Sequence, residues 1–395
     1  MKRQQGYKYR LNLPSGAATR LSQQAGCVRV VWNRAMALSK DKYTGNSALS
    51  ALLPAWKQDL PWLRDADSIA LQQSLRNFDQ AWQNYFKFPE SFDRPTFKKR
   101  GDRDSFRIVG AAAAKTEDNR VWLPKFGWLH FRVSRPWKGT AKSVTFSRKA
   151  GKWYVSILAE REVAEPVKRQ DDWLGIDVGI AEYATPSSGK RHKSIFAMQR
   201  AQKRLTKLQR KLERATKGSR RRQRTKMRLA AGHAQIANKR ADHAHKVSSQ
   251  IVTKHGRIRM EDLRLVNMMK SAKGTIEEPG TNVAQKRGLS RKLADQGLRQ
   301  LRTFIEYKLA WSGGSFEAVD PKYTSQKCHA CKHIARENRV TQADFACVAC
   351  GHTDNADVNA AKNIRDTAVG TIAVKVPPRR RRKSPARDVH IPNAA

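Results

Sequence analysis

Residues Leu174-Gly175-Ile176-Asp177-Val178-Gly179-Ile180 form an apolar stretch that carries a single carboxylate, that of Asp177. A short apolar run bounded by glycines is typical of a buried strand. Burying a carboxylate costs free energy unless another group compensates its charge. The stretch therefore predicts a buried strand whose acid has a partner.

The segments that follow alternate between helical and extended patterns. The helical patterns cover residues 199–253 and 289–311, and the extended patterns cover residues 257–263 and 315–319. Strands that alternate with helices pack as layers, so we expect an α/β domain here. Residues 268–288 contain few apolar side chains and are expected to form a loop.

The first part of the chain predicts a small β-barrel with a helical insertion after its first strand. Residues 7–13 alternate between apolar and polar side chains, which is typical of a half-buried strand. Apolar residues then recur at helical spacing, at Leu71, Leu75, Phe78, Trp82 and Phe86. Alternation returns in residues 120–123, 128–133, 143–147 and 153–158. The aromatic residues of this part are expected to lie mainly in the core, namely Trp122, Trp128, Trp137 and Trp153.

These patterns describe a multidomain α+β protein. Its predicted parts are a β-barrel at 1–14 and 92–165, a helical insertion at 15–91, an α/β domain at 173–324 and 353–368, a cysteine-rich segment at 325–352 and a tail at 369–395. The tail contains Arg379-Arg380-Arg381-Arg382-Lys383 and is expected to be disordered.

The charge of the chain predicts a polyanionic partner. Its 395 residues include 79 Lys and Arg against 34 Asp and Glu, which gives a net charge of +45. Such a charge repels itself in a compact protein unless a polyanion neutralises it. No apolar run approaches the ~20 residues of a membrane-spanning helix, and the start lacks the apolar core of a secretory signal. We therefore expect a cytoplasmic protein that binds nucleic acid.

Residues 199–246 concentrate this charge. They carry 17 Lys or Arg and only two acids, Glu213 and Asp242. A narrow apolar stripe runs along the same segment through Ala201, Leu205, Leu208 and Leu212. One helix face is therefore expected to dock on the protein while the other contacts a phosphate backbone.

Four of the five cysteines form two C-x-x-C pairs. The pairs are Cys328 with Cys331 and Cys347 with Cys350, and fifteen residues separate them. Two such pairs at this spacing predict a zinc ribbon with a tetrahedral Zn²⁺ site. Four thiolates leave no open coordination position, so this zinc is expected to be structural. Redox pairs are the weaker alternative, and the fifth cysteine, Cys27, is expected to be a small buried side chain.

Two further acids resemble Asp177 in their setting. Glu261 ends the predicted strand at 258–261, and Asp357 stands at the start of a predicted helix. If the fold gathers the three acids, they form a site for hard divalent cations, Mg²⁺ or Mn²⁺. Two ions ~4 Å apart can support phosphodiester cleavage. Taken singly, Asp177 could instead be a turn residue, and Asp357 could be a helix N-cap.

Four segments resemble the TnpB family of transposon-encoded RNA-guided DNA endonucleases, which are related to compact type V CRISPR effectors. The segments are Gly175-Ile176-Asp177-Val178-Gly179, Met260-Glu261-Asp262-Leu263, Asp320-Pro321-Lys322-Tyr323-Thr324-Ser325-Gln326-Lys327-Cys328, and Cys350-Gly351-His352 followed by Asp357-Val358-Asn359-Ala360-Ala361-Lys362-Asn363-Ile364. The resemblance runs in order from about Lys8 to Ile364.

The resemblance implies a RuvC-type, RNase H-like nuclease domain whose acids match Asp177, Glu261 and Asp357. It also implies that the wedge-like barrel and its insertion, a recognition domain, hold a guide RNA and read a short motif beside the DNA target. Double-stranded DNA would be cut at one two-metal centre by a monomeric ribonucleoprotein, with a guide RNA from the transposon end. Arg339 resembles a family position near the active site and is expected to stabilise phosphate charge.

One departure from the family pattern and two other functions stay open. Arg257 and Arg259 alternate with apolar residues before Glu261, so one face of that strand is expected to be polar or to contact nucleic acid. The alternatives to a nuclease are a nuclease-inactive RNA-guided DNA-binding repressor and a guide-independent DNA-binding accessory protein of transposition. The presence of all three acids favours the nuclease.

Overall fold

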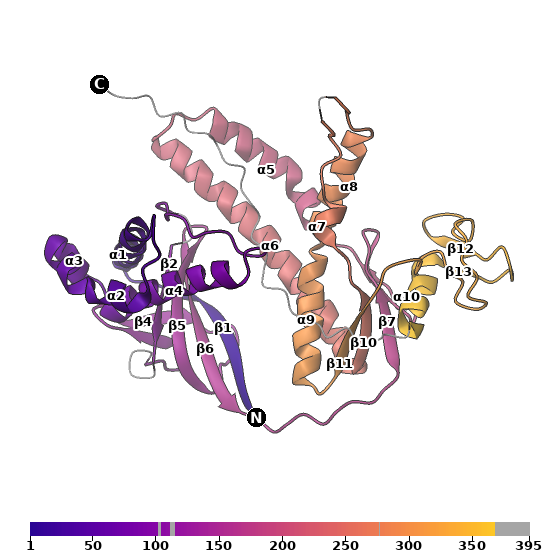
Figure 1. Ribbon diagram of the computed structural model, residues 1–395, viewed down its shortest axis with the longest axis horizontal. Coiled ribbons are helices and arrows are strands. Elements are labelled where there is room, and N and C mark those ends of the chain that lie inside the picture. Colours follow the sequence, from indigo (N-terminus) through magenta and orange to yellow (C-terminus); the bar gives the residue numbers. More distant parts are fainter. Residues whose placement is uncertain (102–103, 111–114, 276, 368–395) are drawn as a thin grey trace. The chain divides into compact units, whose positions relative to one another are not determined.

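The computed structural model describes residues 1–101, 104–110, 115–275 and 277–367, and its chain divides into two compact units after Val163. The predicted tail at 369–395 lies outside the described residues. Both units mix helices with strands, as the sequence predicted, and each is described by itself (Figure 1). No helix in the described ranges combines the length and apolarity that crossing a membrane requires.

The first unit contains a six-stranded antiparallel sheet. Its strands are β1 (Lys2–Asn12), β2 (Ser105–Val109), β3 (Arg120–Leu123), β4 (Gly127–Arg132), β5 (Thr140–Lys149) and β6 (Lys152–Glu162), in the order β2-β5-β6-β1-β4-β3. β1 starts five residues before the predicted strand and buries Tyr7, Tyr9 and Leu11 on one face. This order leaves β2 and β3 at the sheet edges, so closure into a barrel stays a prediction.

Helices follow β1 before the chain re-enters the sheet. They are α1 (Ala17–Leu38), α2 (Asn46–Ala51), α3 (Leu53–Asp59), the 3₁₀ helix η1 (Pro61–Asp65) and α4 (Ser68–Lys87). The carboxylate of Asp67 accepts a hydrogen bond from the backbone of Ala70 at 2.8 Å and caps α4. Phe78 of α4 meets Trp32 of α1 edge to face, with ring centroids 5.3 Å apart. The helical spacing of apolar residues therefore reflects packing of α4 on α1.

The aromatic residues of the sheet are only in part core residues. Trp153 is buried, as predicted. Trp137 is partly buried and packs against the core. Trp122, on the edge strand β3, is 36% exposed, so its assignment to the core was wrong.

The second unit contains a five-stranded mixed sheet. Its strands are β7 (Trp173–Asp177), β8 (Glu182–Pro186), β9 (His192–Lys193), β10 (Arg257–Glu261) and β11 (Ser315–Val319), in the order β11-β10-β7-β8-β9. β7, β10 and β11 are parallel, and β8 and β9 pair antiparallel. The strand predicted from the apolar stretch at 174–180 ends at Asp177, where the chain turns back into β8. A smaller hairpin joins β12 (Asp344–Ala346) to β13 (Thr353–Asn355).

The helices of this unit are α5 (Ala197–Glu213), α6 (Arg220–Lys254), α7 (Leu265–Met268), α8 (Val283–Gln296), α9 (Leu298–Trp311) and α10 (Ala356–Asp366). The predicted helix at 289–311 is wrong in one respect, because Gly297 adopts a left-handed conformation and separates α8 from α9. The predicted loop at 268–288 is shorter, because α8 already begins at Val283.

The sheet of the second unit has two different faces. Leu174 and Ile176 of β7 belong to a buried apolar cluster that also contains side chains of α6 and α9. Gly175, which alternates with them, faces α10 instead, because its nearest neighbours are backbone atoms of Ala361 and Arg365. Figure 1 shows α9 and α10 on opposite sides of β7 and β10.

We predict that Gly175→Ala destabilises the second unit by about 1–3 kcal/mol. A Cβ at this position would lie 2.5 Å from the backbone nitrogen of Arg365, so α10 would have to move. Gly6→Ala is the matched control, since a Cβ there meets nothing within 4 Å. Thermal unfolding of both variants is the measurement. An unchanged melting temperature for Gly175→Ala would contradict the close packing of α10 on β7.

Candidate acidic centre and zinc site

Asp177 and Glu261 are the last residues of two neighbouring parallel strands. Met260 of β10 pairs with Ile176 of β7, so the next residue of each strand is an acid at the same sheet edge. Residues two apart in a strand share a face, so Asp177 points to the side of Gly175 and α10. Strand register therefore brings the first two predicted acids together.

Asp357 reaches this edge on α10. It lies in the first turn of that helix, and the helix packs against β7, β8 and β10. The N-cap of α10 is Asn355, whose side-chain oxygen accepts hydrogen bonds from Asp357 at 3.2 Å and Val358 at 3.3 Å. The alternative reading of Asp357 as the N-cap was therefore wrong, and its carboxylate does not serve as the cap.

Glu261 and Asp357 both act electrostatically on Asp177. Burial raises the pKa of Asp177, and the charges of Glu261 and Asp357 raise it further, to about 7. Burial also raises the pKa of Glu261 and of Asp357. A group of acids that resist ionisation in this way fits a divalent cation, because a bound ion compensates the repulsion.

The spacing of these acids limits how they can share an ion. Among the residues that the structure describes, the four cysteines form the one group of three or more candidate ligands that could hold a metal ion as the side chains stand, and their ligand atoms lie within 4.8 Å of one another. The three carboxylates do not form such a group in the present rotamers. A single ion that contacts all three requires side-chain rotations that bring the oxygens closer, because Mg²⁺–oxygen distances are about 2.1 Å.

Arg339 lies at this centre, although it comes from the segment between the cysteine pairs. Its Nη2 atom is 3.6 Å from Oδ1 of Asp357 and donates a hydrogen bond of 3.0 Å to the backbone oxygen of Gln342. Its charge opposes the upward shifts in the pKa of Asp357 and of Asp177. The structure thus brings all four predicted residues of the centre into one electrostatic neighbourhood.

Two residues of this neighbourhood were missed by the sequence reasoning. The hydroxyl of Thr324 donates to Oε1 of Glu261 and opposes the rise in the pKa of that acid. Glu182 of β8 raises the pKa of Asp357, and its buried Oε2 atom has no hydrogen-bond partner within the described ranges. Thr324 belongs to the segment Asp320–Cys328 that carried the family resemblance, which was the available signal.

The asparagines of α10 connect the acidic centre to the cysteine-rich segment. Asn359 donates to the backbone oxygen of Lys327 at 2.8 Å and accepts from the backbone of His329 at 2.9 Å. Asn363 donates to the oxygens of Thr324 at 3.0 Å and Lys327 at 2.6 Å. The D-x-N-A-A-K-N pattern therefore places Asp357 at the acidic centre. Its two asparagines hold the backbone that leads into the first cysteine pair.

The four predicted zinc ligands form one cluster. Sγ of Cys328 is 3.7 Å from Sγ of Cys350, and Sγ of Cys331 is 3.5 Å from Sγ of Cys347. Tetrahedral zinc with Zn–S bonds of ~2.3 Å places its sulfurs ~3.8 Å apart, so the cluster fits this ion. Burial opposes ionisation of Cys347, but hydrogen bonds from the backbone of Cys350 and Ala349, together with those from the side chains of Cys331 and Cys350, lower its pKa to about 6. This environment favours the thiolate that binds zinc.

The two cysteine pairs lie on equivalent turns. The backbone N–H of Cys328 donates to His333 at 2.8 Å, and that of Cys347 donates to His352 at 2.9 Å. The fully buried Asn338 links the two turns, because it donates to the oxygen of His333 at 3.2 Å and accepts from the nitrogen of Val348 at 3.0 Å. Asn338 was also missed, since neither its type nor its spacing marks it.

The strand arginines before Glu261 have internal partners. Arg259 pairs with Glu317 of β11 at 2.8 Å and donates to the backbone oxygen of Arg365 in α10. Arg257 and Arg259 both lie over the ring of Trp173, each 4.3 Å from its centroid. These arginines therefore have protein partners on β7, β11 and α10, and the expected contact of this face with nucleic acid stays a prediction.

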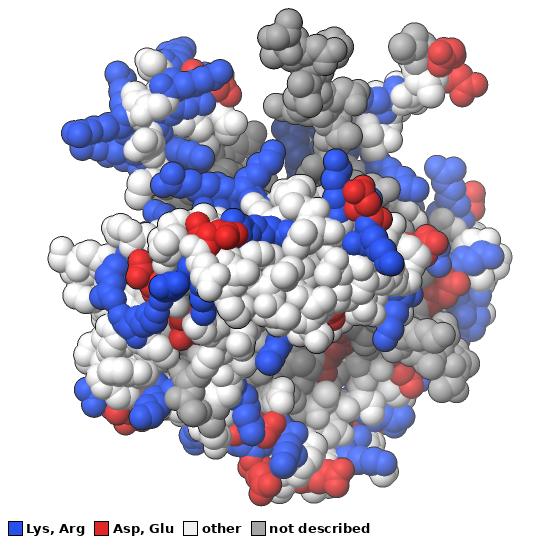
Figure 2. Space-filling model, turned by 60° about the vertical axis from the view of Figure 1, so that its left-hand side comes forward, with Lys and Arg blue, Asp and Glu red and all other residues white. Residues whose placement is uncertain are grey.

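The basic segment forms a helical hairpin of α5 and α6. The predicted apolar stripe is confirmed, because Leu205 is buried against Ile236 of α6 and Ala201 packs beside it. Most Lys and Arg side chains of the two helices stay exposed. On the face shown in Figure 2, Lys and Arg likewise outnumber the scattered acids. This distribution suits contact with a phosphate backbone.

Family models match three segments of the chain. Residues 1–47 match "Helix-turn-helix domain", residues 156–272 match "Probable transposase", both of the OrfB_IS605 type, and residues 299–364 match "Cas12f1-like, TNB domain". The chain is 41% identical over 92% of its length to "Putative RNA-guided DNA endonuclease InsQ" of Escherichia coli K12, of which it covers 92%. The chain belongs to the TnpB family.

Two further comparisons cover most of the chain. A relative from Streptomyces pristinaespiralis, "Putative RNA-guided DNA endonuclease", is 30% identical over 91% of this chain and 88% of its own length. A solved structure described as "Cryo-EM structure of the Cas12f1-sgRNA-target DNA complex" aligns over 92% of this chain and 99% of that chain, with 16% identity and a TM-score of 0.34. The segment matched as a TNB domain includes all four cysteines of the cluster.

We predict that Cys347→Ser removes zinc from this TnpB-family chain and unfolds the segment at 325–352. The reason is that the remaining three thiolates have no further ligand among the described residues that completes the set. Elemental analysis of the purified chain is the measurement. Cys27→Ser is the control, because Cys27 is buried in the first unit. Unchanged zinc content in Cys347→Ser would show that this thiolate is not a ligand.

Proposed function

We propose that the chain is an RNA-guided, divalent-metal-dependent endonuclease that cleaves double-stranded DNA next to a short transposon-associated motif. The observation that carries this proposal is the meeting of Asp177, Glu261 and Asp357 at one sheet edge, with electrostatic repulsion among them. The use of a guide RNA is supported by the name of a relative that aligns over 92% of this chain, "Putative RNA-guided DNA endonuclease InsQ". A guide RNA from the transposon end and a monomeric ribonucleoprotein complete the proposal.

The three acids would hold Mg²⁺ or Mn²⁺. Divalent ions bound there supply activation of the attacking water and stabilisation of the leaving oxygen. The contribution of the chain is to place the carboxylates on two strand ends and a helix start, where burial makes their charge costly. Thr324 fixes one oxygen of Glu261 by its hydrogen bond, which leaves the other oxygen of that carboxylate for a metal.

Arg339 would act on the phosphate. In the structure its guanidinium lies beside Asp357 and donates a hydrogen bond to the backbone oxygen of Gln342. A guanidinium offers five donors in a planar fork, so this contact leaves donors for a phosphate oxygen. The charge that builds up on phosphate during cleavage would then face a fixed cation.

We predict that Asp177→Ala abolishes DNA cleavage while RNA binding and target binding survive. The physical reason is that the acid serves the metal and not the nucleic acid. The assay uses the ribonucleoprotein purified with its own RNA, a plasmid that carries the sequence matching that RNA, and Mg²⁺. Cleavage and gel-shift binding are measured on the same preparation.

Asp262→Asn is the matched control. Asp262 follows Glu261 directly, but it is 60% exposed and pairs with Arg302 at 2.7 Å. This variant is expected to cut at nearly the wild-type rate. Cleavage by Asp177→Ala at the wild-type rate would remove Asp177 from the mechanism. Binding without cleavage by the wild-type protein would favour the repressor.

A further inference from the structure

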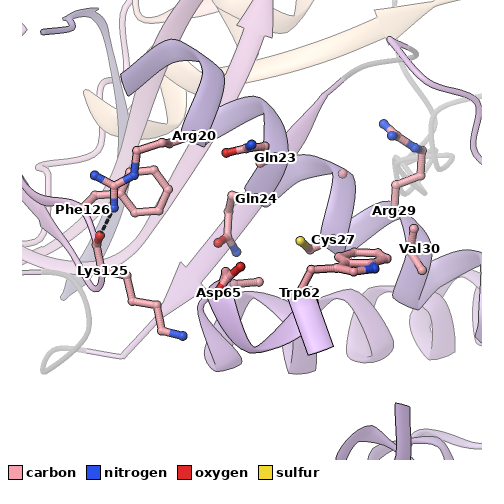
Figure 3. Close-up of a pocket in the computed structure, with 12 residues that line it drawn as sticks. Arg20, Gln23, Gln24, Cys27, Arg29, Val30, Trp62, Asp65, Lys125 and Phe126 are labelled. Carbon is pink, nitrogen blue, oxygen red and sulfur yellow. Dashed lines mark hydrogen bonds between the residues drawn. The ribbon is translucent and has the colours of Figure 1, made fainter. Parts of the chain in front are cut away.

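A cavity of about 710 Å³ lies in the first unit, far along the chain from the acids. It opens between α1, η1 and the turn from β3 to β4 (Figure 3). Its lining residues are Arg20, Gln23, Gln24, Gly26, Cys27, Arg29, Val30, Trp62, Asp65, Ala66, Lys125 and Phe126. Pockets that take small ligands usually measure ~300–1,000 Å³, so the cavity is large enough for a nucleotide.

Aromatic rings and cations border this cavity. The Arg20 guanidinium lies 4.7 Å from the centroid of Phe126 and donates to the backbone oxygen of Lys125. Figure 3 shows this pair at one end of the cavity and Trp62 with Arg29 at the other. Trp62 is 44% exposed although it is a large apolar side chain. An exposed indole beside guanidinium groups offers a stacking surface with charge at its rim.

Polar groups lie between the two ends. Gln24 is 2% exposed, and its Oε1 atom accepts a hydrogen bond of 3.0 Å from the backbone of Asp67. Its Nε2 atom has no partner within the described residues and is buried from solvent, so it does not face a ligand in the cavity. The exposed Asp65 stands next to Gln24 in Figure 3 and offers carboxylate oxygens as acceptors. The accessible polar group between the two ends is therefore the carboxylate of Asp65.

The charge of the lining favours an anion that also carries a flat ring. Three cations, Arg20, Arg29 and Lys125, face one carboxylate, Asp65. Arg29 is only loosely paired, since its Nη1 atom is 3.4 Å from Asp104. Lys125 donates to the backbone oxygen of Arg64. This acceptor is neutral, so the contact does not cancel the charge of Lys125. A nucleotide has a phosphate for these cations and a base for the ring and the polar groups.

We propose that this cavity binds one unpaired nucleotide of a nucleic-acid strand. The base stacks on Trp62, and its polar edge faces the carboxylate of Asp65. The adjoining phosphate lies at Arg20 or Arg29. A base within a duplex cannot reach this position, so the cavity selects a base that is flipped out or single-stranded. The inference requires that the chain binds nucleic acid, but it does not require cleavage.

The test measures binding of short fluorescent single strands to the full-length chain in EDTA, at raised salt to suppress unspecific contacts. RNA and DNA versions of one sequence, and the DNA duplex, are the probes. Trp62→Ala is expected to weaken single-strand binding about tenfold, because stacking of one base on an aromatic ring contributes roughly this factor. Trp62→Phe keeps a ring and is expected to restore most of the affinity.

Trp122→Ala is the matched control. Trp122 is a tryptophan of the same unit, 36% exposed and outside the cavity, and its removal is expected to leave binding unchanged. Arg20→Gln is expected to lower the slope of log affinity against log salt by about 1, while Trp62→Ala leaves that slope unchanged. A 5-iodouracil probe is expected to crosslink to the peptide that contains Trp62.

The outcomes separate the sources of the nucleotide. If Trp62→Ala loses affinity for the RNA strand alone, the cavity is assigned to RNA. If it loses affinity for the DNA strand alone, the cavity is assigned to a displaced DNA strand. Equal affinity of Trp62→Ala and wild type for both single strands overturns the proposal. An equal loss in Trp122→Ala, or a loss confined to the duplex, overturns it as well. Because no probe is cut in EDTA, failure here leaves the proposed nuclease function untouched.

Discussion

The contact between Gly175 and the backbone of α10 is the constraint on which the acidic centre depends. No side chain fits between strand β7 and this helix, because the backbone atoms of Ala361 and Arg365 occupy the space where a Cβ would stand. The contact sets how closely α10 lies against β7, the Asn355 cap sets where the helix begins, and Asp357 lies in its first turn. Parallel pairing of β7 with β10 places Asp177 and Glu261 side by side at one edge of the sheet. Three acids from distant parts of the chain therefore meet through backbone packing.

This arrangement stores electrostatic cost at one place. Burial and the neighbouring charges raise the pKa of Asp177 to about 7, so the metal-free centre retains protons that ordinary carboxyls lose. Two neighbours oppose these upward shifts. The charge of Arg339 stabilises ionised Asp357, and the hydrogen bond from Thr324 stabilises ionised Glu261. The asparagines of α10 tie the same helix to the chain that enters the cysteine cluster. The cysteine cluster and the acidic centre thus share one structural element, α10, and loss of the cluster is expected to disturb both.

The sequence predicted best what depends on neighbouring residues. The cysteine cluster follows from spacing, because each C-x-x-C pair forms its own turn, and the strand-end acids stand out against apolar neighbours. Features that depend on contacts between distant parts of the chain could not be predicted from the sequence. Gly175 looked like a strand boundary rather than the seat of a helix, and Arg259 looked exposed because its partner Glu317 is on another strand. The helix break at Gly297 was missed since apolar spacing continues through it. Closure of the first sheet depends on its edges and stays a prediction.

The most direct test of the shared cation site is calorimetric titration of Mn²⁺ into the zinc-loaded chain at a series of pH values. An ion must displace the proton of Asp177 below pH 7, so the apparent affinity is expected to rise about tenfold per pH unit up to about 7 and then level off. Asp177→Asn, Glu261→Gln and Asp357→Asn are each expected to weaken binding, and Asp177→Asn is expected to show a weaker pH dependence than the wild type. Equal Mn²⁺ affinity in the wild type and all three variants would contradict the account.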